Sequence, residues 1–211
     1  ELELACHARI AADDPKTVLG VPEVMLGLLP GGGGTQRLPR LIGVPAALDL
    51  MLTGRQIRPA KARKLGLVDE VVAPSILLEA AIKRARSLAG KPREEAKPGL
   101  KRWALEGNPI GRRLLFDQAE KQMLAKTKGH YPAPKRILEV VRIGVESGAA
   151  AGLKAEAEAF GELAMTPEAR QLMNIYFATT AMKKDTGVAD AGVQPREVHR
   201  VAVLGAGLMG A

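Results

Sequence analysis

Residues 21–38, VPEVMLGLLPGGGGTQRL, place a carboxylate shortly before a glycine turn and a helix. Glu23 lies among apolar residues, where an ionised carboxylate is costly unless it is paired. Such a group is therefore either used in chemistry or reached by solvent. The run PGGGG at 30–34 predicts a turn, and Thr35 is placed to cap the helix TQRLPRLIG that follows.

The four glycines of this turn admit two interpretations. Their backbone N–H groups could cradle a phosphate ahead of the helix. They could equally provide the close approach of backbone to backbone that only glycine allows. The run does not match the G-x-x-x-x-G-K-[ST] pattern of a P-loop. Packing or loop shape is the favoured interpretation.

Outward from this stretch, the apolar spacing predicts mainly helices. Residues 1–12 read as a helix, and residues 17–29 as a short buried strand followed by a loop. Proline and glycine positions delimit helices at 45–54 and 59–67, and Ser75 is a candidate cap for another at 76–90. Residues 90–111 are expected to be a connector. The patterns after it predict four helices, near 112–127, 134–147, 150–164 and 167–184, and Thr166 is the expected cap of the last one. A linker at 185–197 and a new strand are expected to follow.

Composition narrows the function classes. The chain has 211 residues, 46% hydrophobic content and a formal net charge of +8. Aromatic residues are only 3% of the chain, which disfavours a nucleic-acid surface built on base stacking, so the basic run from Lys83 to Arg102 is interpreted as a solvated face. No apolar run is long enough to cross a membrane. The lone Cys6 fits a reducing compartment. The three histidines lack metal-ligand spacing, and no G-x-S-x-G motif occurs.

The stretch VAVLGAGLMGA at 201–211 carries Gly205, Gly207 and Gly210 at the G-x-G-x-x-G spacing of a dinucleotide-binding turn. An apolar run leads into the turn, as in a Rossmann unit. The helix and the acidic residue that complete such a site are absent from these 211 residues. The motif therefore predicts an NAD-binding domain in a longer protein and no NAD binding by this chain itself.

Glu1 and Glu23 are the candidate carboxylate pair. Two carboxylates from different elements can converge on one substrate, one handling water and one delivering a proton. Spacing alone does not select them, and on pattern alone a frayed terminal residue and a surface charge are the simpler interpretation. The apolar surroundings of Glu23 favour the functional alternative.

Residues 1–43, followed by LTGRQIRPAKARKLGLVDEVV, closely resemble the second half of the crotonase, or enoyl-CoA hydratase, fold. The later AFGELAMTPEARQLMNIYFATTAMKKD resembles the linker helix of multifunctional fatty acid oxidation enzymes. By this resemblance Glu1 matches the family's first catalytic glutamate and Glu23 the second. Glu1 is assigned mainly to the water and Glu23 mainly to the proton. Glu3 departs from the family's usual small residue and is given no catalytic role.

The resemblance implies an α/β protein: a partial crotonase (ClpP/crotonase-like) core at 1–110, a mostly helical segment at 111–184, and a linker with the start of a Rossmann domain at 185–211. It implies a CoA thioester substrate, NAD as cofactor of the longer protein only, a thiolase β subunit as partner, and no nucleic acid. The expected location is a bacterial cytoplasm, or the mitochondrial matrix if the source is eukaryotic.

The resemblance also limits what this chain is expected to do alone. The family's oxyanion donors precede the position of Glu1, and losing one such donor costs on the order of 3 kcal/mol in the transition state. The 211 residues alone are therefore expected to be nearly inactive. Open alternatives are a crotonase-family isomerase, a thioester hydrolase, or a non-catalytic CoA-binding or assembly module.

Overall fold

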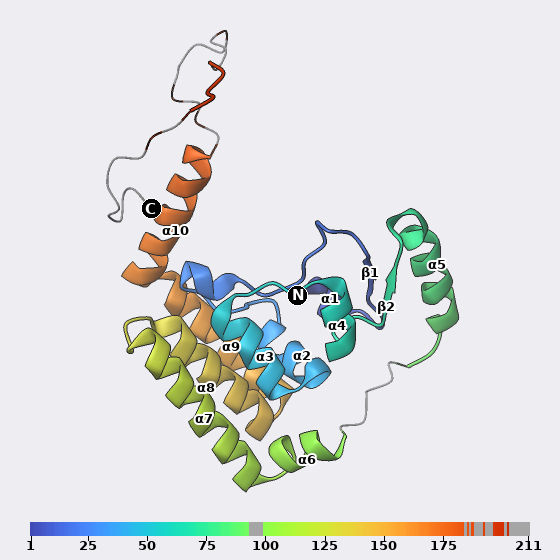
Figure 1. Ribbon diagram of the computed structural model, residues 1–211. Helices are drawn as coiled ribbons and strands as arrows, with labels where there is room; N and C mark the ends of the chain where they lie inside the picture. Colours follow the sequence, from blue (N-terminus) through green and yellow to red (C-terminus); the bar gives the residue numbers. More distant parts are fainter. Residues whose placement is uncertain are drawn as a thin grey trace. The chain divides into compact units, whose positions relative to one another are not determined.

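The computed structural model describes residues 1–92, 99–183, 185, 187, 192, 196–200 and 202, with the backbone alone at 100 and 101. The chain divides into two compact units, residues 1–176 and 177–211 (Figure 1). Gly205, Gly207 and Gly210 lie outside the described residues, so the predicted dinucleotide turn and the Rossmann start stay predictions.

The glycine turn leads directly into helix α2 (Gly34–Ile42). Gly33 is the N-cap residue, in the left-handed region at φ 89°. The expectation that Thr35 caps this helix was wrong, because Thr35 already lies inside the first turn and no side-chain cap bond forms there. The cap lies two residues earlier than the hydroxyl suggests, since Gly33 supplies the backbone conformation there.

Two helices follow as the proline and glycine signals predict. Helix α3 (Val44–Thr53) has a proline in its first turn and ends at Gly54, which is left-handed. Helix α4 (Pro59–Leu65) begins at its proline and ends at left-handed Gly66. Both ends use the residue types that fit helix termini without strain.

The prediction of one helix over residues 1–12 was wrong. Helix α1 (Leu2–Ala5) is short, and strand β1 (Ile10–Ala12) pairs in parallel with β2 (Glu70–Val72), Ala11 opposite Val71. Arg9, at the entrance to β1, donates from Nε to the Leu67 carbonyl at 2.7 Å. A contact made across about sixty residues thus overrides the local helical spacing.

The strand expected within residues 17–29 is also mostly absent. One residue, Leu19, forms an isolated antiparallel bridge with Ile57. The following residues form the 3₁₀ helix η1 (Glu23–Leu26), which ends at left-handed Gly27. The apolar run is therefore a packed loop that carries one turn of helix with Glu23 at its start.

Ser75 does not cap the next helix. It lies in the 3₁₀ turn η2 (Pro74–Ile76), and helix α5 (Leu77–Leu88) follows with no buried residue. The charges on α5 are exposed, as the interpretation of a solvated face requires. The connector expected at 90–111 contains helix α6 (Leu100–Glu106), so that prediction was wrong in part.

The four later helices were predicted correctly, although the ends shift by a few residues. They are α7 (Pro109–Thr127), α8 (Pro132–Ser147), α9 (Ala149–Ala164) and α10 (Pro167–Met182). Thr166 accepts the Ala169 N–H at 3.2 Å, as a cap residue does. Helices α8 and α9 pack against each other, and both pack against α2, while α7 and α8 contact α3 (Figure 1). The core of the first unit lies largely between these helices.

Among the described residues, no helix is long and apolar enough to span a membrane. The same part of the chain brings together no group of three or more histidine, cysteine or acidic side chains suited to a metal ion.

Candidate active site

The glycine turn binds two carboxylates through alternate N–H groups. Gly32 and Gly34 donate their N–H groups to Glu1 Oε1, at 2.8 and 2.7 Å. Gly33 donates to Glu156 Oε1 at 2.6 Å, and Thr35 donates its N–H to Glu156 Oε2 at 3.0 Å. The donors at the start of α2 are thus used by side chains of the chain itself. This supports packing and loop shape over a phosphate cradle.

Glycine is required at this turn because the carboxylate and a ring lie so close to it. A Cβ built on Gly34 would lie 2.5 Å from Glu1 Oε1, and one on Gly31 would lie 2.6 Å from the ring of Phe160. Any larger residue would displace one of these groups. The positive φ of Gly33 adds a conformational reason at the centre of the turn.

Glu23 opens η1 and carries an unpaired atom. Its Oε2 is buried and has no hydrogen-bond partner among the described residues. Burial raises the pKa of Glu23 above its usual value, and the nearby Glu1 carboxylate raises that pKa further, while a backbone N–H lowers it. A half-buried acid of this kind keeps its proton to a higher pH than an ordinary glutamate. Its backbone carbonyl accepts the Leu28 N–H at 3.1 Å, which fixes the loop that carries it.

Sequence reasoning missed Glu156, which lies on α9 and is only 2% exposed. Its Oε2 also accepts the hydroxyl of Thr35. Burial raises its pKa, and bonds from Thr35 and Gly33 oppose that rise. A signal was present in the sequence: Glu156 is in register with the buried Gly152, Ala159 and Leu163, so a charge interrupts the apolar stripe of the helix.

The structure brings the two predicted glutamates into one neighbourhood. Glu1 contacts the turn directly and acts electrostatically on Glu23. Glu1 also borders a cavity of about 710 Å³ with largely aliphatic lining residues. One carboxylate has its Oε1 held by two N–H donors, and the other has an oxygen without a donor. This arrangement can bind water at one carboxylate and deliver a proton from the other.

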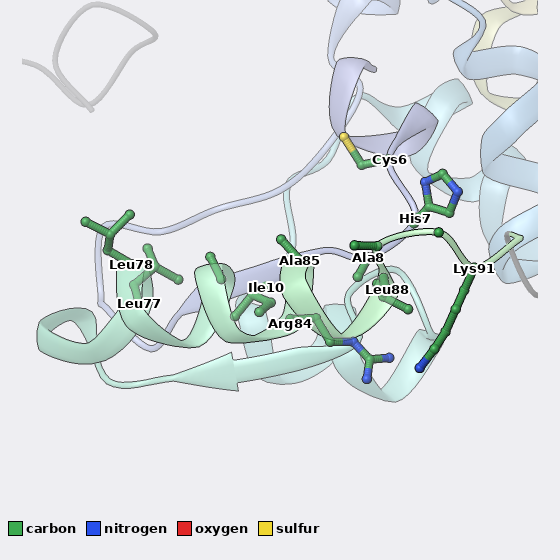
Figure 2. Close-up of a pocket in the computed structure, with 13 residues that line it drawn as sticks. Cys6, His7, Ala8, Ile10, Leu77, Leu78, Arg84, Ala85, Leu88 and Lys91 are labelled. Atoms are coloured by element: carbon green, nitrogen blue, oxygen red, sulfur yellow. The ribbon is translucent and has the colours of Figure 1, made fainter.

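A second cavity of about 740 Å³, which shares Ile10 and Leu77 with the first, lies between α5 and the residues around β1. Figure 2 shows Leu77, Ala85 and Leu88 of α5 on one side and Ile10 close to them. Its charged groups are Arg84 and Lys91, and none of Glu1, Glu23 and Glu156 lines it. This apolar space is therefore distinct from the carboxylate cluster.

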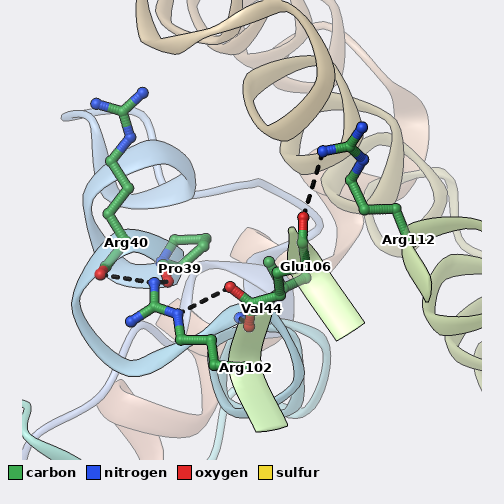
Figure 3. Close-up of polar contacts among 6 residues, drawn as sticks. All are labelled: Pro39, Arg40, Val44, Arg102, Glu106 and Arg112. Atoms are coloured by element: carbon green, nitrogen blue, oxygen red, sulfur yellow. Dashed lines mark hydrogen bonds and ion pairs between the residues drawn. The ribbon is translucent and has the colours of Figure 1, made fainter. Parts of the chain in front are cut away.

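A fourth glutamate, Glu106 on α6, bonds to groups that join helices. Its Oε1 accepts the Val44 N–H at 2.8 Å at the start of α3, and its Oε2 accepts Arg102 Nε at 2.9 Å (Figure 3). Arg102 Nη2 also donates to the carbonyls of Pro39 and Arg40, at 2.8 and 2.7 Å. These bonds fasten α6 to the end of α2 and the start of α3.

A family model described as enoyl-CoA hydratase/isomerase matches residues 1–103. The chain is 59% identical over its whole length to the fatty acid oxidation complex subunit alpha of Shewanella amazonensis. It spans 29% of the length of that curated relative.

Solved structures share the fold. An enoyl-CoA hydratase/isomerase from Pseudoalteromonas atlantica T6c aligns with a TM-score of 0.53 at 20% identity, covering 84% of this chain and 56% of that one. A carnitinyl-CoA hydratase from Mycobacterium avium aligns with a TM-score of 0.53 at 21% identity, covering 85% and 54%. The part of the fold described here is crotonase-like. Residues 1–103 are therefore similar to the enoyl-CoA hydratase/isomerase family, and the whole chain is similar to the α subunits of fatty acid oxidation complexes.

Proposed function

We propose that Glu1 and Glu23 are the acid–base pair of an enoyl-CoA hydratase, which adds water to a trans-2-enoyl-CoA thioester and forms a 3-hydroxyacyl-CoA. The observation that carries the proposal is the buried Oε2 atom of Glu23, which has no hydrogen-bond partner among the described residues. The nearby Glu1 carboxylate is already held by the N–H groups of Gly32 and Gly34. The family match over residues 1–103 supports the same class of reaction.

The two carboxylates take different roles in this proposal. Glu1 accepts a proton from water as the water oxygen forms a bond to C3. The π electrons of the C2–C3 bond move toward the thioester carbonyl, and the resulting enolate takes a proton from Glu23 at C2. The raised pKa of Glu23 suits a group that must hold a proton before it delivers one. The net change is one water molecule added across the double bond.

The surroundings of the pair support this division. Glu1 Oε1 accepts two backbone N–H groups, which fix the direction of this carboxylate. Glu23 Oε2 is shielded from water and has no competing donor among the described residues. We assign the donors that hold the enolate oxygen to the part of the longer relatives that this chain does not span.

The longer relatives support proposals for the whole protein. We place this chain in fatty acid β-oxidation, with NAD-dependent oxidation of the 3-hydroxyacyl-CoA in a following domain, a thiolase β subunit as partner and a bacterial cytoplasmic location. The domain limits at 110/111 and 184/185 and the NAD-binding roles of Gly205, Gly207 and Gly210 belong to the same proposal.

Product analysis in ¹⁸O water tests the class of reaction. The full-length polypeptide that contains this chain is incubated with a trans-2-enoyl-CoA, and the products are identified by mass spectrometry. Hydration places one ¹⁸O atom on C3 of an intact thioester. A shifted double bond without ¹⁸O would indicate an isomerase, free CoA thiol would indicate a thioester hydrolase, and unchanged substrate would indicate a non-catalytic module. Each of these three results contradicts the proposal.

A further inference from the structure

Glu156 is a buried carboxylate that the proposed hydration does not use. It lies on α9, more than 120 residues along the chain from the turn that it contacts. Its Oε1 accepts one N–H group, and its Oε2 accepts an N–H group and a hydroxyl. Since both oxygens already accept bonds from the turn and the side chain is buried, Glu156 is not open to a substrate. In this respect it differs from Glu23.

The position of Glu156 points to an indirect role. The four N–H groups from Gly32 to Thr35 are consecutive, and they alternate between Glu1 and Glu156. Moving one pair of donors disturbs the other, because the peptide planes that carry them are joined in sequence through shared Cα atoms. We infer that Glu156 is a positioning residue for the hydration reaction: it fixes the glycine turn so that Gly32 and Gly34 hold the Glu1 carboxylate in its working orientation.

Further bonds connect Glu156 to the helices around it. Gln36 Nε2 donates to Thr35 Oγ1 at 2.9 Å and to the Val140 carbonyl of α8 at 3.3 Å. The ring of Phe160, one turn along α9 from Glu156, lies against Gly31. The turn is therefore fixed from α8 and α9, and these later helices complete the catalytic site.

A double-mutant cycle tests this inference, which rests on the proposed function. Glu156→Gln keeps an oxygen that can accept the Gly33 N–H. It replaces the oxygen that accepts the Thr35 N–H by an amide NH₂ group, which cannot accept a hydrogen bond. Hydration is measured in the full-length polypeptide for Glu156→Gln, for Glu1→Gln and for both changes together. The matched control is Glu158→Gln, the same chemical change on the exposed face of α9. Thermal unfolding is recorded for every variant.

The expected result is non-additive. Glu1→Gln lowers kcat by about 10²- to 10⁴-fold, the range of one acid–base group. Glu156→Gln lowers kcat by about tenfold through misplacement of Glu1, with KM changed less than about twofold. In the Glu1→Gln background, the same Glu156 change costs less than about twofold, because the group that it positions is already gone. Glu158→Gln changes nothing.

Each other outcome has a definite reading. If Glu1→Gln keeps full activity, the proposed function is wrong, independently of Glu156. If Glu1→Gln is impaired and Glu156→Gln behaves like the control, the positioning role is overturned. Equal losses in both backgrounds also overturn it, since a merely structural change is additive. Should Glu156→Gln fail to fold, Thr35→Val removes the hydroxyl that donates to Glu156 and accepts Gln36 Nε2 but leaves the N–H donors in place, and the same cycle with Glu1→Gln decides the question.

Discussion

Charged side chains from distant helices hold both ends of α2, Glu156 of α9 at its start and Arg102 of α6 at its end, but the site around the start differs from the junction at the end. At the end, Glu106 contacts the first N–H of α3 and is paired with Arg102. At the start, Glu1 and Glu156 share four N–H donors and form no ion pair with a cationic side chain of the described residues, and Glu23 keeps a buried oxygen without a donor there. A fully paired carboxylate stabilises the fold, whereas an underpaired buried one is available for chemistry.

The largest expected effect comes from Glu1, on the reactive side of this comparison. Glu1→Gln should lower kcat for hydration by about 10²- to 10⁴-fold, because the water loses its base. The amide oxygen can still accept the Gly32 N–H, so the midpoint of urea unfolding should not change. Assays following the absorbance of the enoyl thioester in the full-length polypeptide measure the first effect. Retained activity would show that Glu1 is not the base.

The next largest effect is expected for Glu156→Ala, which should lower the free energy of unfolding. Glu156→Ala leaves the N–H groups of Gly33 and Thr35 and the Thr35 hydroxyl without their acceptor and removes a buried side chain. The expected loss in free energy of unfolding is about 3 kcal/mol, the range for breaking a buried network. Urea unfolding at neutral pH measures it. Glu158→Ala, on the exposed face of α9, is the control, and equal losses for both variants would contradict the account.

Arg102 probes the fully paired junction. Arg102→Ala removes the cation from Glu106 and the donor from two carbonyls at the end of α2. The expected cost is about 1–2 kcal/mol of unfolding free energy, since these bonds are partly shielded from solvent. Arg113→Ala serves as control, because its pair with Asp117 is exposed and long at 3.7 Å. Activity per folded molecule should be unchanged in both variants. A strong loss of kcat in Arg102→Ala would remove the distinction between the two regions.

The smallest effect is on the pH dependence of stability. Burial raises the pKa of Glu23, so the folded protein binds this proton more tightly than the unfolded chain does. Its contribution to stability is present below the unfolded pKa and is lost as pH rises through the higher folded pKa. Glu23→Gln should therefore flatten the fall of stability just above the usual pKa of glutamate. Urea unfolding at a series of pH values tests this, and parallel curves for both proteins would contradict it.

Local signals in the sequence predicted much of the fold. The helices at 44–53 and 59–65 have prolines in their first turns and glycines just after their ends, which act within a few residues. Strand β1 was missed and the strand expected within 17–29 was overestimated, because strand pairing depends on partners far along the chain. Ile10 pairs with Glu70, and Leu19 bridges to Ile57. Spacing rules carry no information about such contacts.

The candidate site was likewise predicted only in part from the sequence. Glu1 and Glu23 were predicted from a family resemblance and from the apolar surroundings of Glu23. Glu156 was missed, because its relation to the turn exists only after α9 packs against α2. The charge on the buried stripe of α9 was the one local sign. A buried acid on an apolar stripe therefore merits a search for distant donors.

The rate of hydration by Glu23→Gln is the most direct test of the proposal that Glu23 delivers the proton to C2. The assay uses a trans-2-enoyl-CoA and the full-length polypeptide, with Glu106→Gln as the matched change in the paired region. We expect kcat to fall by about 10²- to 10⁴-fold in Glu23→Gln, because the group that supplies the proton to C2 is lost. Glu106→Gln should retain its activity per folded molecule. A folded Glu23→Gln protein that hydrates at the unmodified rate would contradict the account.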